Sequence, residues 1–407
     1  MLATLARGVK GGKWYTLIDK VFDRRNLETA ASKVLQKAGS AGVDRQTVLG
    51  FAKKRDREID RLEQSLRNGD YQPKAVRRSL IPKPGSAERR PLGIPTVRDR
   101  VVQTAIVHVI EPILDNEFHA RSFGFRHGRG CHDALKCVEE KLDAGYVFVV
   151  DADLKSYFDT IPKERLLALV AQHIADTRIL ELIKKYLNQS ILEELHEWIP
   201  VTGVPQGAVL SPVLANLYLN PFDHHMSRQG YEMVRYADDF VVLCRTREEA
   251  EAALREIKQW VEDAGLTLHP TKTRIVDSRV ESFAFLGYSF RDRFRFPREK
   301  SHVKLMDRIR ELTPRTSGNS MEAVCERLSR MLRGWFRYFR HCHWRTFRDY
   351  DRYIRTRLRH ILLKRNRRNP ERLPATQRWP NRFFETVGLY SLHEAHRYFV
   401  QSLEGNH

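Results

Sequence analysis

The chain has 407 residues, 42% of them hydrophobic, which is enough for two or three domains with cores and excludes a chain disordered throughout. Lysine and arginine number 71 against 51 acidic residues, a formal charge of +20 that favours an anionic partner such as nucleic acid. No stretch approaches the roughly 20 apolar residues of a membrane span, and the five cysteines lack the spacing of a zinc ribbon or a disulfide framework. We expect a cytoplasmic protein without a membrane partner.

The first part of the chain combines helical patterns with one predicted hairpin. From Trp14 to Leu66 the apolar residues recur at helical spacing, with a loop at 37–47. Residues 79–95, "SLIPKPGSAERRPLGIP", predict two strands joined by a basic tip. The pattern "TVRD" at 96–99 is typical of a helix start, and the apolar residues behind it predict a core helix.

The middle of the chain predicts strands that end in acidic residues. Residues 146–154, "YVFVVDADL", indicate a central strand whose end emerges at a surface, followed by a helical stretch to about 195. Residues 201–219 run from a Gly/Pro loop into an apolar helix. Residues 231–244, "YEMVRYADDFVVLC", predict two short strands with an aspartate pair at their junction, and 246–265 predict a capped helix. The order is strand, helix, hairpin, helix, strand.

From about residue 320 the pattern is helical and basic. One predicted helix has an apolar face made by Val324, Leu328, Leu332, Trp335 and Phe339. A second, at about 349–366, is expected to carry Arg352, Arg355 and Arg359 as a row on its surface. Residues 291–370 contain 24 lysines and arginines against 8 acidic residues, and we interpret this clustering as a face that binds an anionic partner.

The adjacent carboxylates of Asp238 and Asp239 are costly within an apolar hairpin, because like charges repel more strongly when partly buried. A divalent ion offsets that cost, and Asp153, at the end of another apolar strand, is a natural third ligand. Mg²⁺ prefers oxygen ligands, and two ions about 3.5–4 Å apart can stabilise an in-line phosphoryl transfer. The alternative is a surface turn with solvated acids.

A long ordered series of segments resembles the reverse transcriptases encoded by group II introns. The segments are "GVD", "IPKPGSAERRPLGIPTVRDRVVQ", "SFGFRHGRG", "VVDADLKSYFDTIP", "GVPQGAVLSPVLANLYL", "RYADDFVVL", "GLTLHPTKTRI", "FLGYSF", "LRGWFRYF" and "RWPNRFFETVGLYSL". They run from residue 42 to residue 392. The resemblance implies an α+β right-hand polymerase, with fingers and a palm of mixed sheet and helices, followed by a basic helical thumb that doubles as a maturase domain.

The resemblance also implies domain boundaries. We expect an N-terminal extension at 1–45, fingers at 46–145 and a palm at 146–290, with a helical insertion at about 163–200. The thumb/maturase domain is expected at 291–368 and a tail at 369–407. The sequence shows no endonuclease domain after the tail motif, so second-strand cleavage by this chain is not expected.

Roles are implied residue by residue. Asp153, Asp238 and Asp239 match the catalytic metal ligands, with the backbone of Leu154 beside the first, for two Mg²⁺ ions or Mn²⁺ in their place. Asp151 is interpreted as support for the site and Asp159 as structural. The nucleotide-binding positions are Lys83, Arg90 (or its neighbour Arg89), Phe158, Gln206 and Lys272. Phe158 would stack under the sugar and exclude a 2′-hydroxyl, and Lys272 would give a proton to the leaving pyrophosphate.

The implied nucleic-acid contacts lie toward the end of the chain. They are Gly287, in the segment expected to hold the primer end, and Arg330, Arg333, Arg337, Arg340, Arg355 and Arg359. The implied function is an RNA-directed DNA polymerase that binds RNA template, DNA primer or target, dNTPs and group II intron RNA, and that assists splicing and mobility in a bacterial cytoplasm. Two alternatives stay open: a domesticated reverse transcriptase in defence or repair, and a non-catalytic RNA-binding splicing factor. The sequence leaves the oligomeric state undetermined.

Overall fold

The structure is a computed structural model that describes residues 12–82, 89–316, 318–366 and 373–404. The chain forms two compact units, Met1–Ile275 and Val276–His407, and has a mixed α+β architecture. Within the described residues, no helix combines the length and apolar character needed to cross a lipid bilayer.

The first unit begins with helices that surround the long helix α6. The elements are α2 (Ile18–Val21), α3 (Arg24–Lys37), α4 (Val48–Ala52), α5 (Arg55–Asn68) and α6 (Val97–Asp115). Thr96 caps α6 by accepting a hydrogen bond from the backbone N–H of Asp99 at 3.1 Å, as the "TVRD" pattern predicts. Because the apolar residues of α6 surround the helix, it lies in the core with α3 against it.

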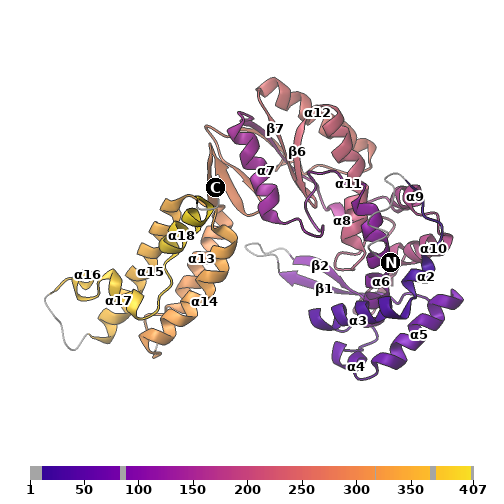
Figure 1. Cartoon of the computed structure of the whole chain (residues 1–407), viewed down its shortest axis with the longest axis horizontal. Helices are drawn as coiled ribbons and strands as arrows, with labels where there is room; N and C mark the ends of the chain where they lie inside the picture. The colour runs from indigo at the N-terminus through magenta and orange to yellow at the C-terminus, as the bar shows by residue number, and fades with distance from the viewer. Residues whose placement is uncertain (1–11, 83–88, 317, 367–372, 405–407) are drawn as a thin grey trace. The chain divides into compact units, whose positions relative to one another are not determined.

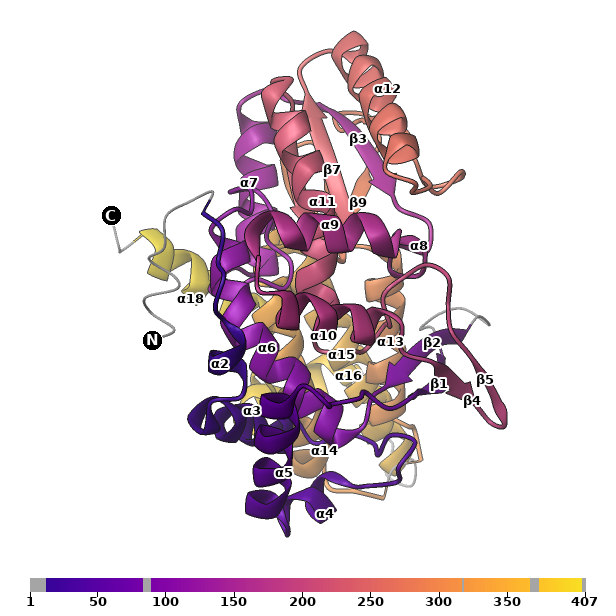
Figure 2. The ribbon, with the colours of Figure 1, turned by 90° about the vertical axis from the view of Figure 1, so that its right-hand side faces the viewer.

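A four-stranded sheet of order β2-β1-β4-β5 contains the predicted hairpin, β1 (Val76–Pro82) and β2 (Arg89–Ile94). Its tip, 83–88, lies outside the described residues. The predicted helical stretch to about 195 is wrong at its end: α8 (Tyr157–Thr160), α9 (Lys163–His173) and α10 (Thr177–Leu187) are followed by a hairpin of β4 (Ile191–Glu193) and β5 (His196–Trp198). This hairpin forms because β4 pairs in parallel with β1, a long-range contact that local spacing does not reveal (Figure 2).

The second sheet of this unit has the order β6-β7-β3-β8, with the strands β3 (Phe148–Asp153), β6 (Glu232–Tyr236), β7 (Asp239–Cys244) and β8 (Arg274–Asp277). The helix α12 (Arg247–Asp263) packs on β3 and β7, whereas α7 (Cys131–Asp143) and α11 (Ser211–Arg228) pack on β6 (Figure 1). The interiors of β3 and β7 are apolar and buried, and the acidic residues stand at one end of both strands. The predicted strand, helix, hairpin, helix, strand order is confirmed.

The second unit is a small sheet followed by helices. The strands are β9 (Phe283–Phe285), β10 (Tyr288–Arg291) and β11 (Phe294–Pro297), and the helices are α13 (Glu299–Leu312), α14 (Met321–Phe339), α15 (Trp344–Arg365), α16 (Ala375–Arg378), α17 (Asn381–Thr386) and α18 (Leu392–Glu404). The predicted apolar face of α14 is buried, apart from the half-buried Trp335, whose ring stacks on Phe339 with the centroids 4.6 Å apart.

Candidate active site

The three predicted carboxylates come together at one end of the second sheet. Strands β3 and β7 pair antiparallel in a register that sets Asp153 directly opposite Asp239. Asp238 lies in the turn just before β7, and Tyr236, which ends β6, pairs with Asp239 on its other side. The register therefore gathers three acids from segments that are 85 residues apart in the chain.

The turn between β6 and β7 has an unusual backbone. Ala237 adopts φ +59°, in the left-handed region that residues with a side chain rarely occupy. Two residues earlier, at the end of β6, Arg235 is buried, with its guanidinium paired to the buried carboxylate of Asp223 on α11. Burial alone would lower the pKa of Arg235, but Asp223 outweighs that effect and the pKa is raised, so Arg235 stays charged.

The site concentrates negative charge. Burial, and then the charge of Asp153, raise the pKa of Asp238 above its ordinary value. Asp151 also faces this region, and burial raises its pKa to about 6 although Arg274 stands 3.8 Å away. Ionised carboxylates held in this way are destabilised until a cation neutralises them. The site is therefore suited to bind a cation.

A lysine already contacts one of these acids. The segment after α12 runs beside the end of β3, where the backbone N–H of His269 donates to the carbonyl of Asp153 at 2.7 Å and Leu154 bridges to Leu268. This pairing brings Lys272 to Asp153, and its ammonium donates a hydrogen bond to the carboxylate.

The carboxylates suit magnesium in their chemistry. All three supply oxygen donors, and the pKa of Asp238 is raised by burial and, to a smaller extent, by the charge of Asp153. In the described part of the chain, no three His, Cys, Asp or Glu side chains are already arranged around a common metal position. The backbone therefore brings the acids together, whereas the Asp153 carboxylate is engaged by Lys272.

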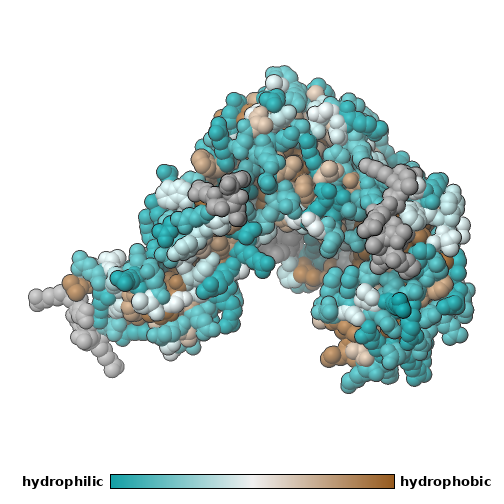
Figure 3. Space-filling model, in the orientation of Figure 1, coloured by the Kyte–Doolittle hydropathy of each residue, from teal (hydrophilic) through white to brown (hydrophobic). Residues whose placement is uncertain are grey.

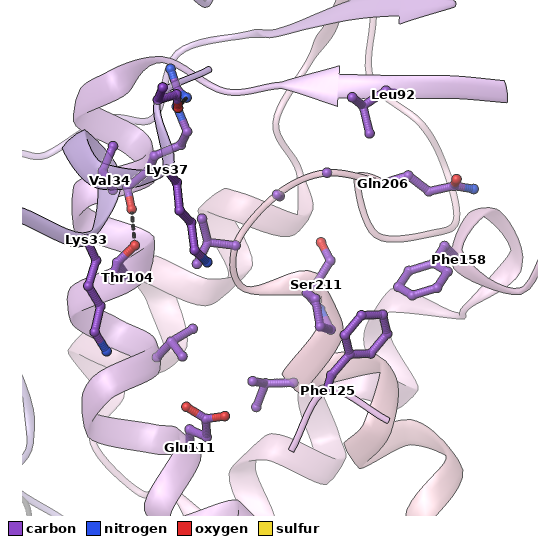
Figure 4. Close-up of a pocket in the computed structure, with 18 of the residues that line it drawn as sticks. Lys33, Val34, Lys37, Leu92, Thr104, Glu111, Phe125, Phe158, Gln206 and Ser211 are labelled. Carbon is purple, nitrogen blue, oxygen red and sulfur yellow. Dashed lines mark hydrogen bonds between the residues drawn. The ribbon is translucent and has the colours of Figure 1, made fainter. Parts of the chain in front are cut away.

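A pocket of about 1010 Å³ lies between the β1–β2 hairpin, α3, α6 and residues 206–213. Three predicted nucleotide-binding residues line it: Arg90, Phe158 and Gln206. Figure 4 shows Phe158 and Gln206 on one side of the pocket and Lys33 and Lys37 on the other. The walls are partly apolar, and the cations among them suit an anionic ligand with planar groups.

The predicted residues around Gln206 form a hydrogen-bonded chain. Arg90 Nε donates to Gln206 Oε1 at 3.0 Å, and Gln206 Nε2 donates to Asp159 Oδ2 at 3.0 Å. The backbone N–H of Gly93 on β2 donates to the carbonyl of Gln206 at 2.6 Å. A side chain at Gly207, which has φ +100°, would collide with the carbonyl of Gly93. The β1–β2 hairpin and the loop at residues 206–207 therefore pack in direct backbone contact. Lys83 lies outside the described residues.

In the second unit, Gly287 lies in a turn that has positive φ (+80°) and is held by side chains. Its carbonyl accepts hydrogen bonds from the backbone N–H of Arg298 at 3.0 Å and from Ser301 Oγ at 3.2 Å, and Tyr338 Oη donates to the neighbouring Leu286 carbonyl at 2.8 Å. The glycine meets the backbone requirement of this turn. Its contact with a primer stays a prediction.

The arginines of the second unit differ in exposure. Arg330 and Arg337 are exposed, Arg333 lies over the ring of Tyr390, and Arg340 lies over that of Phe399. The surface over α13, α14 and α15 is mostly hydrophilic (Figure 3).

One expectation about the second basic helix is wrong. Arg359 is buried, 9% exposed, and donates hydrogen bonds to the carbonyl of Trp379 and to Asn381 Oδ1, both at 2.9 Å. Arg359 therefore holds the segment 379–381 to α15. Arg355 is half-buried, with a carboxylate oxygen of Asp351 3.9 Å away, whereas Arg352 is exposed as expected.

Comparison with known proteins identifies the family. Residues 81–290 match the family model described as reverse transcriptase (RNA-dependent DNA polymerase), and residues 303–379 match the maturase-specific domain of group II introns. The chain is 34% identical to Protein YkfC of Escherichia coli K12 over 270 residues, which is 57% of this chain and 70% of YkfC. It is 38% identical to the group II intron-encoded protein LtrA of Lactococcus lactis over 186 residues, which is 46% of this chain and 30% of LtrA.

The chain therefore belongs to the reverse transcriptase family, and its α+β first unit has the right-hand polymerase fold of that family. The second unit matches the maturase-specific domain of group II introns, so the chain joins a reverse transcriptase to a maturase-type domain. Among solved structures, a chain of a "Partial Cas6-RT-Cas1--Cas2 complex" is similar at a TM-score of 0.40 and 24% identity, covering 63% of this chain and 44% of that chain. This likeness is too distant to support a conclusion.

Sequence reasoning missed the residues that support the turn. Arg235, Asp223 and Asn216 are each 1% exposed and are hydrogen-bonded together. One signal was present: Arg235 is a charged residue inside an apolar strand directly before the aspartate pair. A charge in such a place needs a buried partner. Which acid supplies it depends on how α11 packs on β6, and the sequence pattern does not give that packing.

Proposed function

We propose that the chain is an RNA-directed DNA polymerase of the group II intron type, acting on RNA template, DNA primer and dNTPs. One observation carries this: Asp153 stands opposite Asp239 in the β3–β7 ladder, with Asp238 next to it in the turn. A mere surface turn would not require the third acid, nor would it need the cation-lined pocket that the same unit holds. A non-catalytic splicing factor would keep the cost of these crowded carboxylates without a use for them.

The residues have separate proposed tasks. Asp153, Asp238 and Asp239, with the backbone of Leu154, would hold two Mg²⁺ ions, or Mn²⁺. When bound, such ions stabilise charge on the attacking and leaving oxygens of a phosphoryl transfer. Lys272 now neutralises Asp153, and we propose that it turns to the leaving pyrophosphate and gives it a proton.

The nucleotide would lie in the pocket. Arg90, with Lys83, would neutralise the triphosphate, since a guanidinium can hold phosphate oxygens by two hydrogen bonds. Gln206 is already oriented by Arg90 and Asp159 and would contact the nucleotide or template base. Phe158, in the pocket wall, would pack against the sugar and exclude a 2′-hydroxyl.

The second unit supports an additional role in binding intron RNA and assisting its splicing and mobility. Exposed arginines on α14 would contact phosphates without reading sequence, which suits a structured RNA. The proposed RNA contacts are Arg330, Arg333, Arg337 and Arg340, with the half-buried Arg355 as a further contact. Arg359 is buried and would not contact RNA.

Primer extension tests the polymerase. The purified chain is expected to add dNTPs to a DNA primer on an RNA template when Mg²⁺ is present and to stop when EDTA is added. Protein with all three aspartates intact that extends no primer at any Mg²⁺ concentration would refute the proposal. Sequencing of the RNA that co-purifies tests the intron partner, and RNA unrelated to introns would favour a domesticated enzyme.

A further inference from the structure

The turn that carries Asp238 and Asp239 is fixed from behind by a set of contacts that we call the turn brace: Asn216, Asp223, Arg235 and Gly124. Arg235 Nε donates to Asp223 Oδ1 at 2.7 Å, and a second guanidinium nitrogen donates to the other carboxylate oxygen. The remaining nitrogen, Nη1, donates to Asn216 Oδ1 at 3.0 Å and to the carbonyl of Ala237 at 2.8 Å. The guanidinium thus joins α11 to the residue just before Asp238.

The brace also includes the backbone of residues 121–125. Asn216 Nδ2 donates to the carbonyl of Gly124 at 2.7 Å. The N–H of Phe123 donates to the carbonyl of Arg235 at 2.9 Å, and the N–H of Arg235 donates to the carbonyl of Arg121 at 3.0 Å. A Cβ at Gly124 would collide with the backbone nitrogen of Ala237. This segment therefore lies directly against the turn, with no space between their backbones.

Stability alone does not explain this arrangement. A buried ion pair such as Arg235–Asp223 contributes little net stability, because removing two charges from water costs about as much as their attraction returns. The left-handed backbone at Ala237 adds a further cost. Apolar residues would pack here at lower cost. The polar contacts instead fix geometry: they hold the Ala237 carbonyl in one orientation, and this sets the backbone conformation of Asp238 and Asp239.

We propose that Asn216, Asp223, Arg235 and Gly124 are positioning residues that hold the Asp238 and Asp239 carboxylates in the geometry needed for metal binding, an inference that rests on the proposed polymerase function. They act through the backbone of the turn. Polar residues that orient metal ligands from behind are typically worth about 10- to 100-fold in metal affinity or activity.

The test compares two glycines of one segment, Gly124→Ala and Gly130→Ala. The new methyl group forces the turn to move at Gly124, whereas at Gly130 it would lie 3.7 Å from Asp133 Oδ2, an ordinary contact. Mn²⁺ is titrated into the full chain, and the free ion is measured by electron paramagnetic resonance. We expect the Mn²⁺ concentration for half-saturation to rise about tenfold for Gly124→Ala and to stay unchanged for Gly130→Ala.

Asn216→Ala provides a second variant, because it removes two hydrogen bonds of the brace without adding a collision. Circular dichroism confirms folding at the temperature of the titration. Folded Gly124→Ala and Asn216→Ala proteins that bind Mn²⁺ as tightly as the wild type would overturn the proposal. A wild-type chain that binds Mn²⁺ more tightly than both variants yet extends no primer would support the brace and contradict the polymerase function.

Discussion

The aspartate turn of the first unit and the helix α14 of the second both carry clustered charge. In the turn the charged groups are half-buried on a fixed backbone, whereas on α14 they are exposed to solvent. In the turn, the acids are crowded and half-buried, and a buried arginine fixes the backbone beside them. On α14, Arg330 and Arg337 are exposed, and Arg330 is paired with Glu326 one helical turn away. Chemistry at a reacting phosphate needs fixed geometry, whereas binding a phosphate backbone requires only density of charge. Changes in the turn should therefore affect the rate of primer extension, whereas changes on α14 should affect the affinity for RNA.

The largest effect is expected from Asp238→Asn. Removing a metal-binding carboxylate should reduce primer extension on the order of 1,000-fold, since metal stabilisation is worth several kcal/mol. The same change should leave the metal-free protein as stable as the wild type or more so, because it relieves the repulsion from Asp153. Extension rates and thermal unfolding without metal measure both effects. Glu262→Gln, on the exposed side of α12, should change neither.

A smaller change in specificity is expected from Phe158→Ala. If the ring excludes a 2′-hydroxyl, its removal should raise ribonucleotide incorporation relative to deoxynucleotide by about tenfold or more. Single-nucleotide extension with dNTP and rNTP gives the ratio. Phe125→Ala removes another ring that lines the same pocket and serves as the control. An equal gain in both variants would indicate general loosening and contradict the specific role of Phe158.

The pH dependence of stability tests the charge of the acidic site. The pKa of Asp151 is about 6 in the folded chain, above its ordinary value of 3.8, so the unfolded chain releases this proton first as the pH rises. The free energy of unfolding should therefore fall between about pH 4 and pH 6 and stay lower above that range. Asp151→Asn removes this loss, and should be more stable than metal-free wild type by about 1–3 kcal/mol at pH 7.5, with a smaller gain at pH 5. Equal gains at both values would contradict the shift.

The smallest effect concerns single arginines of the second unit. Arg337→Gln should reduce the slope of log affinity against log salt for single-stranded RNA by about 0.7 and leave the melting temperature unchanged. Arg359→Gln should do the reverse, since it breaks the buried contacts with Trp379 and Asn381, at a cost of about 1–3 kcal/mol in unfolding free energy. RNA titrations at several salt concentrations and thermal melts separate the two.

Local patterns predicted most of the elements but few of the contacts between them. The start of α6 at Thr96, the strand β3 and the strands on either side of Asp238 were each predictable from a pattern only a few residues long. The β4–β5 hairpin, by contrast, depends on pairing with β1, more than 100 residues away. Arg359 has the spacing of a surface residue and is buried because the segment around Trp379 folds over it.

The candidate site follows the same division. Asp238 and Asp239 stand out in the sequence because adjacent carboxylates are costly within an apolar hairpin, and the resemblance to group II intron reverse transcriptases adds Asp153 as the third ligand. The contact of Lys272 with Asp153 and the brace around Arg235 arise from packing between segments distant in the chain, so no local spacing predicts them.

Competition between Mn²⁺ and Mg²⁺ for the metal-free chain tests most directly whether acids from two strands form one metal site. We predict that Mg²⁺ displaces Mn²⁺ from the wild type, and that Asp153→Asn and Asp239→Asn each weaken Mn²⁺ binding by tenfold or more. Wild-type Mn²⁺ affinity in folded Asp153→Asn protein would contradict the account, because the two strands would then not share a site.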